Sequence, residues 1–372
     1  MHTTPIPRVA VRRRRSLLAP AVAAIVASLV LVPSAAQAEQ PISAQDAAGS
    51  LQRYLAAHAD HFHTVFQGTE FADYGLTLDG VIAMDAAGVG DTESARATTF
   101  VADNIGSYLG TGTESYAGPT AKTLLISLSQ GRTPKGFLGG VNLIARLKAR
   151  QTANGQFKDK SQFGDFSNTI TQSLAVVSLR KAGQSLGTKA VPFLANSQCP
   201  NGGFRLAVSV NQCSNNAKAD SDATSFAIQG LLSGSQTSAV KTRISRAIHF
   251  LRTQQGSDGG VKGAGPTNTA NSNSTGLAVL AFSTTGHPNA ATQGRLFLRS
   301  LRYDCTFPAE MRGAIAYDAA GFANARSQGG TATLSDQDLR STTQATLGFA
   351  PVPLYKVTNV GAKASAPAFT CP

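Results

Sequence analysis

The chain has 372 residues, 42% of them hydrophobic, and a formal net charge of +12. This length and composition exclude a disordered chain and fit a folded protein with a large core. Without residues 1–38 the chain carries 28 basic and 21 acidic residues, or +7, and its Lys and Arg are scattered. The charge therefore argues against a nucleic-acid-binding protein.

Residues 1–38 have the features of a secretion signal. The basic run Arg12–Arg15 precedes the apolar run Leu17–Val32, and Ala36-Gln37-Ala38 offers a small-x-small cleavage pattern. The apolar run is short for a membrane span. The arginines also loosely fit a twin-arginine signal, so both export routes remain open. We expect residues 39–372 to be a secreted, extracellular single domain with no membrane span.

Five stretches of the exported part share one pattern: a polar start, an apolar body and a closing glycine. Asp, Asn and Thr cap helix starts, and Gly suits the end of a helix. The nearly unbroken apolar bodies predict helices that are covered on most sides. From the third stretch onward the closing glycines recur about every fifty residues, which indicates a repeat architecture. The stretches are Asp73–Gly88, Tyr116–Gly131, Asn168–Gly183, Ala219–Gly234 and Asn271–Gly286.

A second set of predicted helices alternates with the first and has only one apolar face. In Ser238–Gln255 the apolar residues follow the spacing of three and four that marks one helical stripe, and the basic residues lie away from it. Each repeat is thus predicted to contain an amphipathic helix, a turn and a more apolar helix. Similar stretches are Ala48–Ala57, Ala95–Leu109, Val141–Arg150, Thr188–Gln198 and Ala291–Leu301.

The turn between the two helices carries a pattern of its own, Q-x-x-[N/D]-G-x-[F/V]. It occurs at Gln151–Phe157, Gln198–Phe204 and Gln255–Val261. Asn-Gly and Asp-Gly supply the positive backbone angles of a tight turn, and the residue that follows is expected to return to the core. This pattern predicts architecture and carries no chemistry.

Four cysteines lie in the predicted exported part. An even number in an oxidising compartment favours two disulfides, for which three pairings are possible. We favour Cys199–Cys213, which closes a short loop, and Cys305–Cys371, which would hold the C-terminal tail. The spacings do not resemble those of a zinc site.

The turn pattern, followed by a helix that opens with Asp and Thr, resembles the prenyltransferase and squalene-cyclase repeat. Five copies are clear, and a degenerate sixth runs from Ala291 to about Ala350. The resemblance implies an all-α fold, an α/α toroid of about six helix-pair repeats around a central cavity. The repeats alone would also permit an open solenoid.

The superfamily that the chain resembles includes terpenoid cyclases, protein prenyltransferase β-subunits and the cobalamin-binding head of intrinsic factor and transcobalamin. The Asp-Tyr-Gly-Leu-Thr sequence at Asp73 and the Gly-Gly-Val-Asn-Leu sequence at Gly139 are similar to secreted actinobacterial members. The cobalamin-binding relatives use a second small domain to close over the ligand, and no such domain follows here.

In a closed ring, parallel inner helices would bring their starts together at one mouth of the cavity. Helix N-termini attract anionic and polar groups, so polar residues there could form a ligand-binding rim. The alternative is that each side chain only caps its own helix. The predicted rim residues are Asp73, Tyr74, Asp79, Tyr116, Asp165, Asn168, Thr224, Asn271 and Asn273.

The stretch Asp220-Ser221-Asp222-Ala223-Thr224 resembles the D-x-D-D-T-A motif of class II terpenoid cyclases, whose middle Asp protonates an alkene or epoxide. The resemblance implies that Asp222 is the acid and Asp220 its neighbour, since a paired carboxylate can retain a proton. Ala223 replaces the third Asp of the motif. A cyclase also shelters carbocations with aromatic rings, yet the chain has no Trp and only 7% aromatic residues.

A metal site and a cofactor are not predicted. His58 and His61 could share one helical face with Asp60 nearby, but His63 would turn away, and a metal needs three or four converging ligands. The zinc of prenyltransferases is held by Asp, Cys and His, and the cysteines here are predicted to form disulfides.

These observations predict an extracellular protein that binds a bulky small molecule or a cell-surface partner in its central cavity or at its polar rim. The alternative is a class II terpenoid-cyclase-like enzyme that uses Asp222. A third hypothesis is a non-catalytic cell-surface scaffold whose cavity is filled by side chains.

Overall fold

The computed structural model describes residues 42–137 and 140–371, all within the compact unit Gln37–Pro372. The predicted signal, residues 1–38, lies outside the described residues, and so does Gly139. Among the described helices, none combines the length and the apolar character that crossing a membrane requires.

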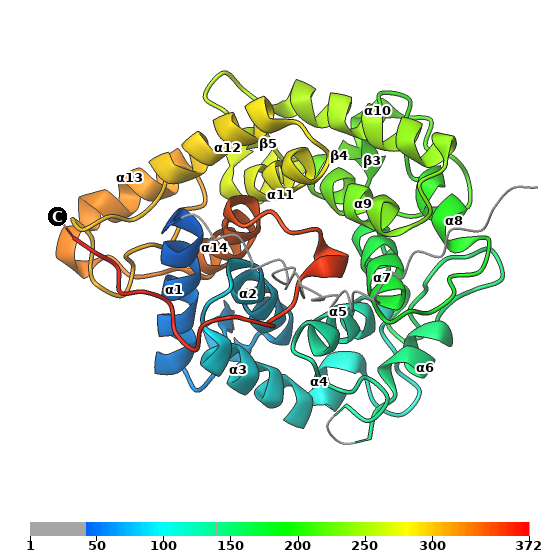
Figure 1. Ribbon diagram of the computed structural model, residues 1–372, viewed down its shortest axis with the longest axis horizontal. Helices are drawn as coiled ribbons and strands as arrows, with labels where there is room; N and C mark the ends of the chain where they lie inside the picture. The colour runs from blue at the N-terminus through cyan, green and yellow to red at the C-terminus, as the bar shows by residue number, and fades with distance from the viewer. Residues whose placement is uncertain (1–41, 138–139, 372) are drawn as a thin grey trace, which may run out of the picture. The chain divides into compact units, whose positions relative to one another are not determined.

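Six helices form an inner ring in which each helix contacts the next (Figure 1). The last inner helix, α14, contacts the first, α2, so the ring is closed. This confirms the predicted ring and overturns the open solenoid that the repeats alone also permitted. The inner helices are α2 (Tyr74–Ala87), α5 (Ala117–Ser129), α7 (Thr169–Lys181), α9 (Ser221–Ser233), α11 (Ser272–Thr284) and α14 (Asp336–Phe349).

The inner helices run parallel to one another. At their starts, the Arg340 guanidinium in α14 pairs with Asp73, which caps α2. At their ends, Arg180 Nε in α7 donates to the carbonyl oxygen of Ser233 in α9 at 3.2 Å. All six starts therefore face one end of the ring, which we call the N-terminal mouth. The opposite end is the C-terminal mouth.

A second set of helices packs outside this ring, as the amphipathic stretches predicted. Residues 95–109 do not form one helix, because α3 ends before Asn104. The Nδ2 of Asn104 donates to the carbonyl of Phe100 at 2.9 Å. The helix α13 was not predicted. The outer helices are α1 (Ile42–Ala57), α3 (Asp91–Asp103), α4 (Ile105–Leu109), α6 (Leu143–Lys148), α8 (Ala190–Asn196), α10 (Ser238–Gln254), α12 (Pro288–Ser300) and α13 (Ala319–Gln328).

The Q-x-x-[N/D]-G turn follows one outer helix and packs against the next outer helix. Gln255 Nε2 donates to the carbonyls of Gly259 and Ala290, both at 3.0 Å, and so ties the end of α10 to α12. Gly259 has a φ of +87°, and a Cβ there would lie 2.2 Å from the carbonyl oxygen of Gln293. Only glycine fits such a close approach with this backbone conformation.

The second and third of these turns are each followed by a short antiparallel strand pair that leads into an inner helix. Phe204 pairs with Asp220, and Val261 pairs with Asn271. The strands are β1 (His63–Phe66), β2 (Thr69–Ala72), β3 (Phe204–Arg205), β4 (Ala219–Asp220), β5 (Val261–Lys262) and β6 (Ala270–Asn271). Four 3₁₀ turns complete the list: η1 (Asn216–Lys218), η2 (Gly265–Thr267), η3 (Gly329–Thr331) and η4 (Leu354–Lys356).

The C-terminal tail crosses the C-terminal mouth, and Figure 1 shows its first part near the middle of the ring. Leu354 N–H donates to Gln229 Oε1 at 3.2 Å, and Asn359 N–H donates to the carbonyl of Ser129 at 2.9 Å. Lys181 Nζ donates to the carbonyl of Val357 at 2.6 Å. The ends of α5, α7 and α9 therefore hold the tail in place.

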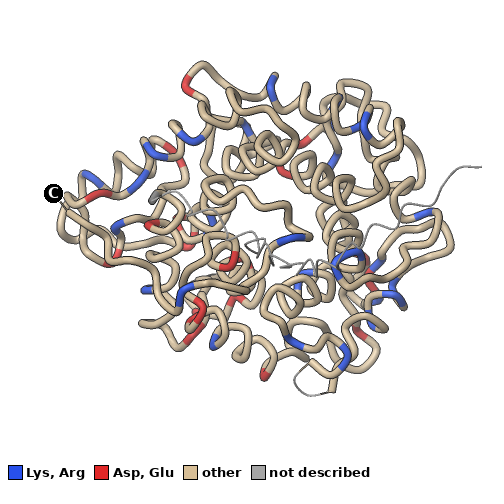
Figure 2. Tube along the Cα trace, in the orientation of Figure 1, with Lys and Arg blue, Asp and Glu red and all other residues tan. Residues whose placement is uncertain are grey.

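The structure contains two disulfides. Cys199–Cys213 has an S–S distance of 2.05 Å, and Cys305–Cys371 has one of 2.04 Å. These are the two pairings that the sequence favoured. Basic and acidic residues are interspersed along the described trace (Figure 2), in keeping with a solvated surface.

Candidate functional site

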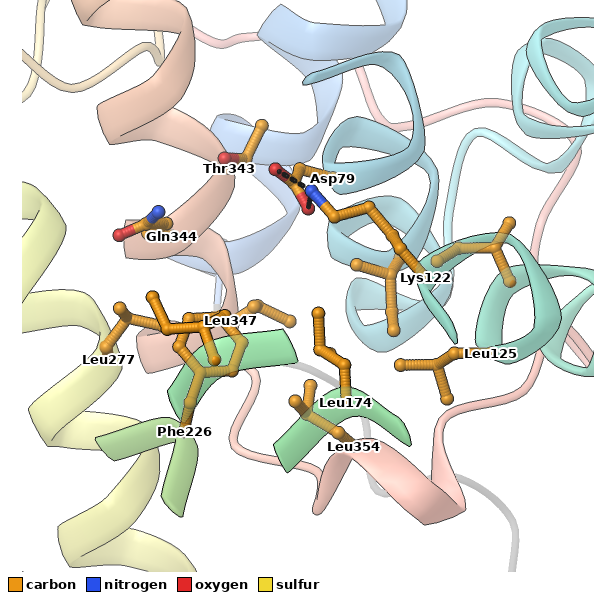
Figure 3. Close-up of a pocket in the computed structure, with 13 residues that line it drawn as sticks. Asp79, Lys122, Leu125, Leu174, Phe226, Leu277, Thr343, Gln344, Leu347 and Leu354 are labelled. Atoms are coloured by element: carbon orange, nitrogen blue, oxygen red, sulfur yellow. Dashed lines mark hydrogen bonds and ion pairs between the residues drawn. The ribbon is translucent and has the colours of Figure 1, made fainter. Parts of the chain in front are cut away.

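A cavity of about 210 Å³ lies at the centre of the inner ring, and all six inner helices contribute to its wall (Figure 3). Most of this wall is apolar because the inner helices turn their aliphatic residues toward the ring axis as well as outward. Leu354 of the tail forms part of the floor, so the tail closes the cavity at the C-terminal mouth. The apolar floor consists of Leu125, Leu174, Phe226, Leu277, Leu347 and Leu354.

An ion pair marks the polar side of the cavity. Lys122 Nζ lies 2.7 Å from Asp79 Oδ1 and also donates to the carbonyl of Gly75 at 3.2 Å. Burial has the largest single effect and lowers the pKa of Lys122, but Asp79, Tyr108 and Asp73 together outweigh it and raise the pKa of the ammonium group. Lys122 therefore stays protonated and cannot serve as a nucleophile.

Asp222 lies one helical turn closer to the N-terminal mouth than the cavity residue Phe226. It precedes the cavity residue Phe226 by four positions, and Asn273 precedes Leu277 by four, so each shares a helix face with a cavity residue. Asp222 Oδ1 is buried and has no hydrogen-bond partner among the described residues. The same holds for Asn273 Oδ1 and Gln344 Oε1.

We call Asp222, Asn273 and Gln344, together with the neighbouring Ser274, the Asp222 cluster. Burial and then the charge of Asp220 raise the pKa of Asp222 to about 6, while Ser274 opposes this shift. Tyr317 also lies near, since its own pKa is raised by burial and then by Asp222. A carboxyl group with such a pKa can both hold and release a proton close to neutral pH.

Asp220 caps the inner helix that carries Asp222. Its Oδ1 accepts the N–H of Ala223 at 2.7 Å and so caps α9. The Asp220 side chain is turned back onto its own helix, and its charge raises the pKa of Asp222. This geometry fits the alternative hypothesis that Asp220 caps its own helix.

Several predicted rim residues also cap their helices. Asp73 accepts the N–H of Leu76 at 2.8 Å, and Asn168 accepts that of Thr171 at 3.0 Å. Asn271 accepts the N–H of Ser274 at 2.9 Å and is itself buried. A cap bends back to its own backbone, which turns it away from the cavity.

Thr224 does not lie on the rim. It is fully buried and accepts the N–H of Phe204 at 2.7 Å, while its hydroxyl donates to the carbonyl of Asp220. Thr275 accepts the N–H of Val261 in the same way at 2.8 Å. This threonine therefore joins the turn to the inner helix in more than one repeat.

The remaining predicted rim residues lie in or beside the loops of the N-terminal mouth, away from the cavity lining. The ring of Tyr74 stacks on that of Phe100, with centroids 5.9 Å apart. The hydroxyl of Tyr116 donates to Glu114 Oε2 at 3.0 Å. Asp165 accepts the N–H of Asp159 at 3.1 Å and orders its own loop. Among the predicted rim residues, Asp79 lines the cavity and Asn273 belongs to the Asp222 cluster.

Lys122, Gln344 and Leu354 were missed by the sequence analysis. Lys122 had a usable signal, because it is a lone cation inside the apolar run from Ala121 to Leu128. Gln344 belongs to the degenerate sixth repeat and Leu354 to the tail, where no pattern indicated a place near the ring axis.

The histidines at the end of α1 form an aromatic cluster. The ring of His61 stacks on Phe100 with centroids 4.0 Å apart, and it lies 4.1 Å from the ring of His63. His63 Nδ1 lies 3.2 Å from Glu70 Oε1. Within the described residues, no group of three or more His, Cys, Asp or Glu could hold a metal ion.

The closed double ring has counterparts among solved structures. The type II terpene cyclase MstE from Scytonema matches with a TM-score of 0.56 over 82% of this chain and 95% of the cyclase, at 10% identity. The chain is an α/α toroid. An unsaturated glucuronyl hydrolase specific for heparin matches with a TM-score of 0.55 over 84% of this chain and 98% of the hydrolase, at 13% identity.

A protein from Actinoplanes also shares the toroid, with a TM-score of 0.53 over 83% of this chain and 99% of that protein, at 13% identity. Comparison with protein-family models and with curated proteins found no match. Identities this low show a common fold and leave the chemistry to the site itself.

Proposed function

We propose that this protein is an exported α/α toroid that binds a small amphipathic molecule in its central cavity. The observation that carries the proposal is the cavity itself, in which an apolar floor faces the Asp79–Lys122 pair and the Asp222 cluster lies one turn above. Apolar pockets with a few polar groups that fix orientation are typical of small-molecule sites.

The volume of the cavity limits the size of the ligand. Its volume of about 210 Å³ is below the roughly 300–1,000 Å³ of pockets for drug-sized ligands. It therefore supports a smaller molecule than the bulky ligand predicted from the sequence, and it is too small for a corrinoid. An open cavity also argues against the scaffold hypothesis, which required side chains to fill it.

The N-terminal mouth provides the route of entry. The tail closes the other end, and exposed apolar side chains gather in the loops that lead into α2, α7 and α9. They are Val65, Phe66, Phe71, Phe163, Phe166, Leu206 and Val210. Such side chains support the approach of a ligand with an apolar part. The two disulfides support an extracellular location, where such bonds persist.

Native mass spectrometry of the protein recovered from the medium of its own host tests this proposal. We expect a complex that carries one small molecule. Leu277→Trp, which fills the cavity, should abolish it. Leu296→Trp makes the same change at an exposed position of α12 and should leave it intact. Protein that is always recovered empty, or a ligand that Leu277→Trp still retains, would contradict the proposal.

A second candidate function is proton transfer by Asp222, as in a class II terpenoid-cyclase-like enzyme. The buried Oδ1 of Asp222 and its pKa of about 6 favour this candidate. Against it, Phe226 is the aromatic residue of the cavity wall, which leaves little shelter for a carbocation. Incubation with geraniol in D₂O tests it. A cyclised product should contain deuterium and should vanish with Asp222→Asn.

A further inference from the structure

Three oxygen atoms of the Asp222 cluster accept no hydrogen bond of good geometry within the described residues, although the Ser274 hydroxyl lies close enough to Asp222 to lower its pKa. Asp222 Oδ1, Asn273 Oδ1 and Gln344 Oε1 are buried without hydrogen bonds to other described residues. They come from α9, α11 and α14, which are consecutive in the inner ring. A buried acceptor without a donor costs free energy, so this half of the inner ring is complementary to a group that donates hydrogen bonds.

The neighbouring charge that acts on Asp222 is also negative. The charged group that acts on Asp222 most strongly is Asp220, another carboxylate. No cation of the described residues is among the groups that act on the pKa of Asp222. Two cations of the inner helices are engaged elsewhere, since Lys122 pairs with Asp79 and Arg340 pairs with Asp73. A buried carboxylate is stabilised by a cation in contact with it. The protein supplies none at this position among the described residues.

An anionic ligand is disfavoured at the same place. Helix N-termini attract anions through free N–H groups, but side chains of this protein already accept those N–H groups. Asp220 caps α9 and Asn271 caps α11. A ligand carboxylate would also meet Asp222 at close range and would be repelled by it.

We propose that the Asp222 cluster binds the primary ammonium group of an amphipathic amine whose apolar body lies on the cavity floor. This inference rests on the proposed function and names its ligand class. An ammonium group has three N–H donors and no acceptor, which matches a set of unpartnered acceptors made of one carboxylate and two amide oxygens. Hydrogen bonds between an ammonium and a carboxylate are stronger than neutral ones.

Three probes with the same apolar body test the proposal by isothermal titration calorimetry on the full mature chain. They are octylamine, octanol and octanoate. At pH 7.5 we expect octylamine to bind at least tenfold more tightly than either of the others. Asp222→Asn should weaken octylamine at least tenfold and leave octanol within about twofold, since one charged contact is lost.

Asp220→Asn is the matched control. It removes a carboxylate two positions away, and Asn caps a helix as well as Asp does. Octylamine should therefore keep its affinity within about threefold. An equal loss in the two variants would overturn the proposal, because attraction would then come from the general negative field. Circular dichroism of each variant shows whether it is folded.

The remaining outcomes separate this inference from the proposed function. If octanol binds as tightly as octylamine and Leu277→Trp abolishes both, the cavity binds apolar ligands and the ammonium site is wrong. If octanoate binds most tightly, the site prefers an anion and the inference is wrong. If no probe binds, both proposals are overturned for ligands of this size.

Discussion

Lys122 in α5 and Asp79 in α2 form an ion pair on the wall of the central cavity, with 2.7 Å between Nζ and Oδ1. The two residues are 43 positions apart, and neighbouring inner helices bring them together. Both side chains are partly exposed, at 20% for Lys122 and 32% for Asp79. The pair therefore lies between a weak surface ion pair and a costly buried one.

Removal of Asp79 should destabilise the protein more than removal of the whole pair. Asp79→Asn leaves the Lys122 ammonium without its carboxylate, whereas Asp79→Asn with Lys122→Met leaves no charge. We expect Asp79→Asn to cost about 1–2 kcal/mol and the double variant less, with a coupling of about 1 kcal/mol. Urea denaturation of the wild type, Asp79→Asn, Lys122→Met and the double variant measures this coupling. A coupling near zero would show that the pair does not contribute to stability.

Asp222→Asn should stabilise the empty protein near neutral pH. Its folded pKa of about 6 lies above the ordinary 3.8, so ionisation above pH 6 costs more in the folded state than in the unfolded state. After allowance for a favourable position at a helix start, we expect a gain of about 1–2 kcal/mol at pH 7. The gain should vanish below about pH 3, where the carboxyl group is protonated in both states.

Urea midpoints of wild type and Asp222→Asn at about pH 3 and pH 7 measure this gain. A variant that is more stable yet loses octylamine would show that Asp222 is kept for binding at the expense of stability. If the variant is less stable at pH 7, the carboxylate has a partner that we have not identified.

Asp85 should make stability fall as the pH rises from about 4 to 7. Burial raises its pKa to about 7, although Ser129 and Gln130 donate hydrogen bonds that oppose the shift. Over this range the folded state holds a proton that the unfolded state has released, so the free energy of unfolding decreases with pH and then levels off. Asp85→Asn should remove much of this slope, as thermal or urea unfolding at several pH values will show. An unchanged slope would assign it to other groups.

Gly259→Ala should destabilise the protein by about 2–5 kcal/mol, the sum of a left-handed backbone cost and a steric clash. The control is Gly265→Ala. Gly265 also has a positive φ, of +57°, but a Cβ there meets nothing within 4 Å. The Gly265→Ala variant should lose about 1 kcal/mol of stability, from the left-handed backbone conformation alone. Equal losses in urea denaturation would mean that the contact between the turn and α12 does not constrain the outer ring.

Local patterns in the sequence determined the helices and the turns. The polar start and closing glycine of stretches such as Asn271–Gly286 predicted the inner helices, because capping and apolar periodicity act within a few residues. The three Q-x-x-[N/D]-G turns were predicted for the same reason. The boundaries were less well predicted where one side chain interrupts a helix, as Asn104 does between α3 and α4.

Tertiary structure decided which polar residues reach the cavity. Whether Asp220 or Asp222 faces the ring axis depends on which of them turns back to cap α9, and whether Asp79 meets a cation depends on a helix 43 positions away. Leu354 lies on the cavity floor because the tail is held by carbonyl and amide groups at the ends of other helices. Contacts between distant segments leave no periodic pattern, so the closed ring had to be seen before the site could be found.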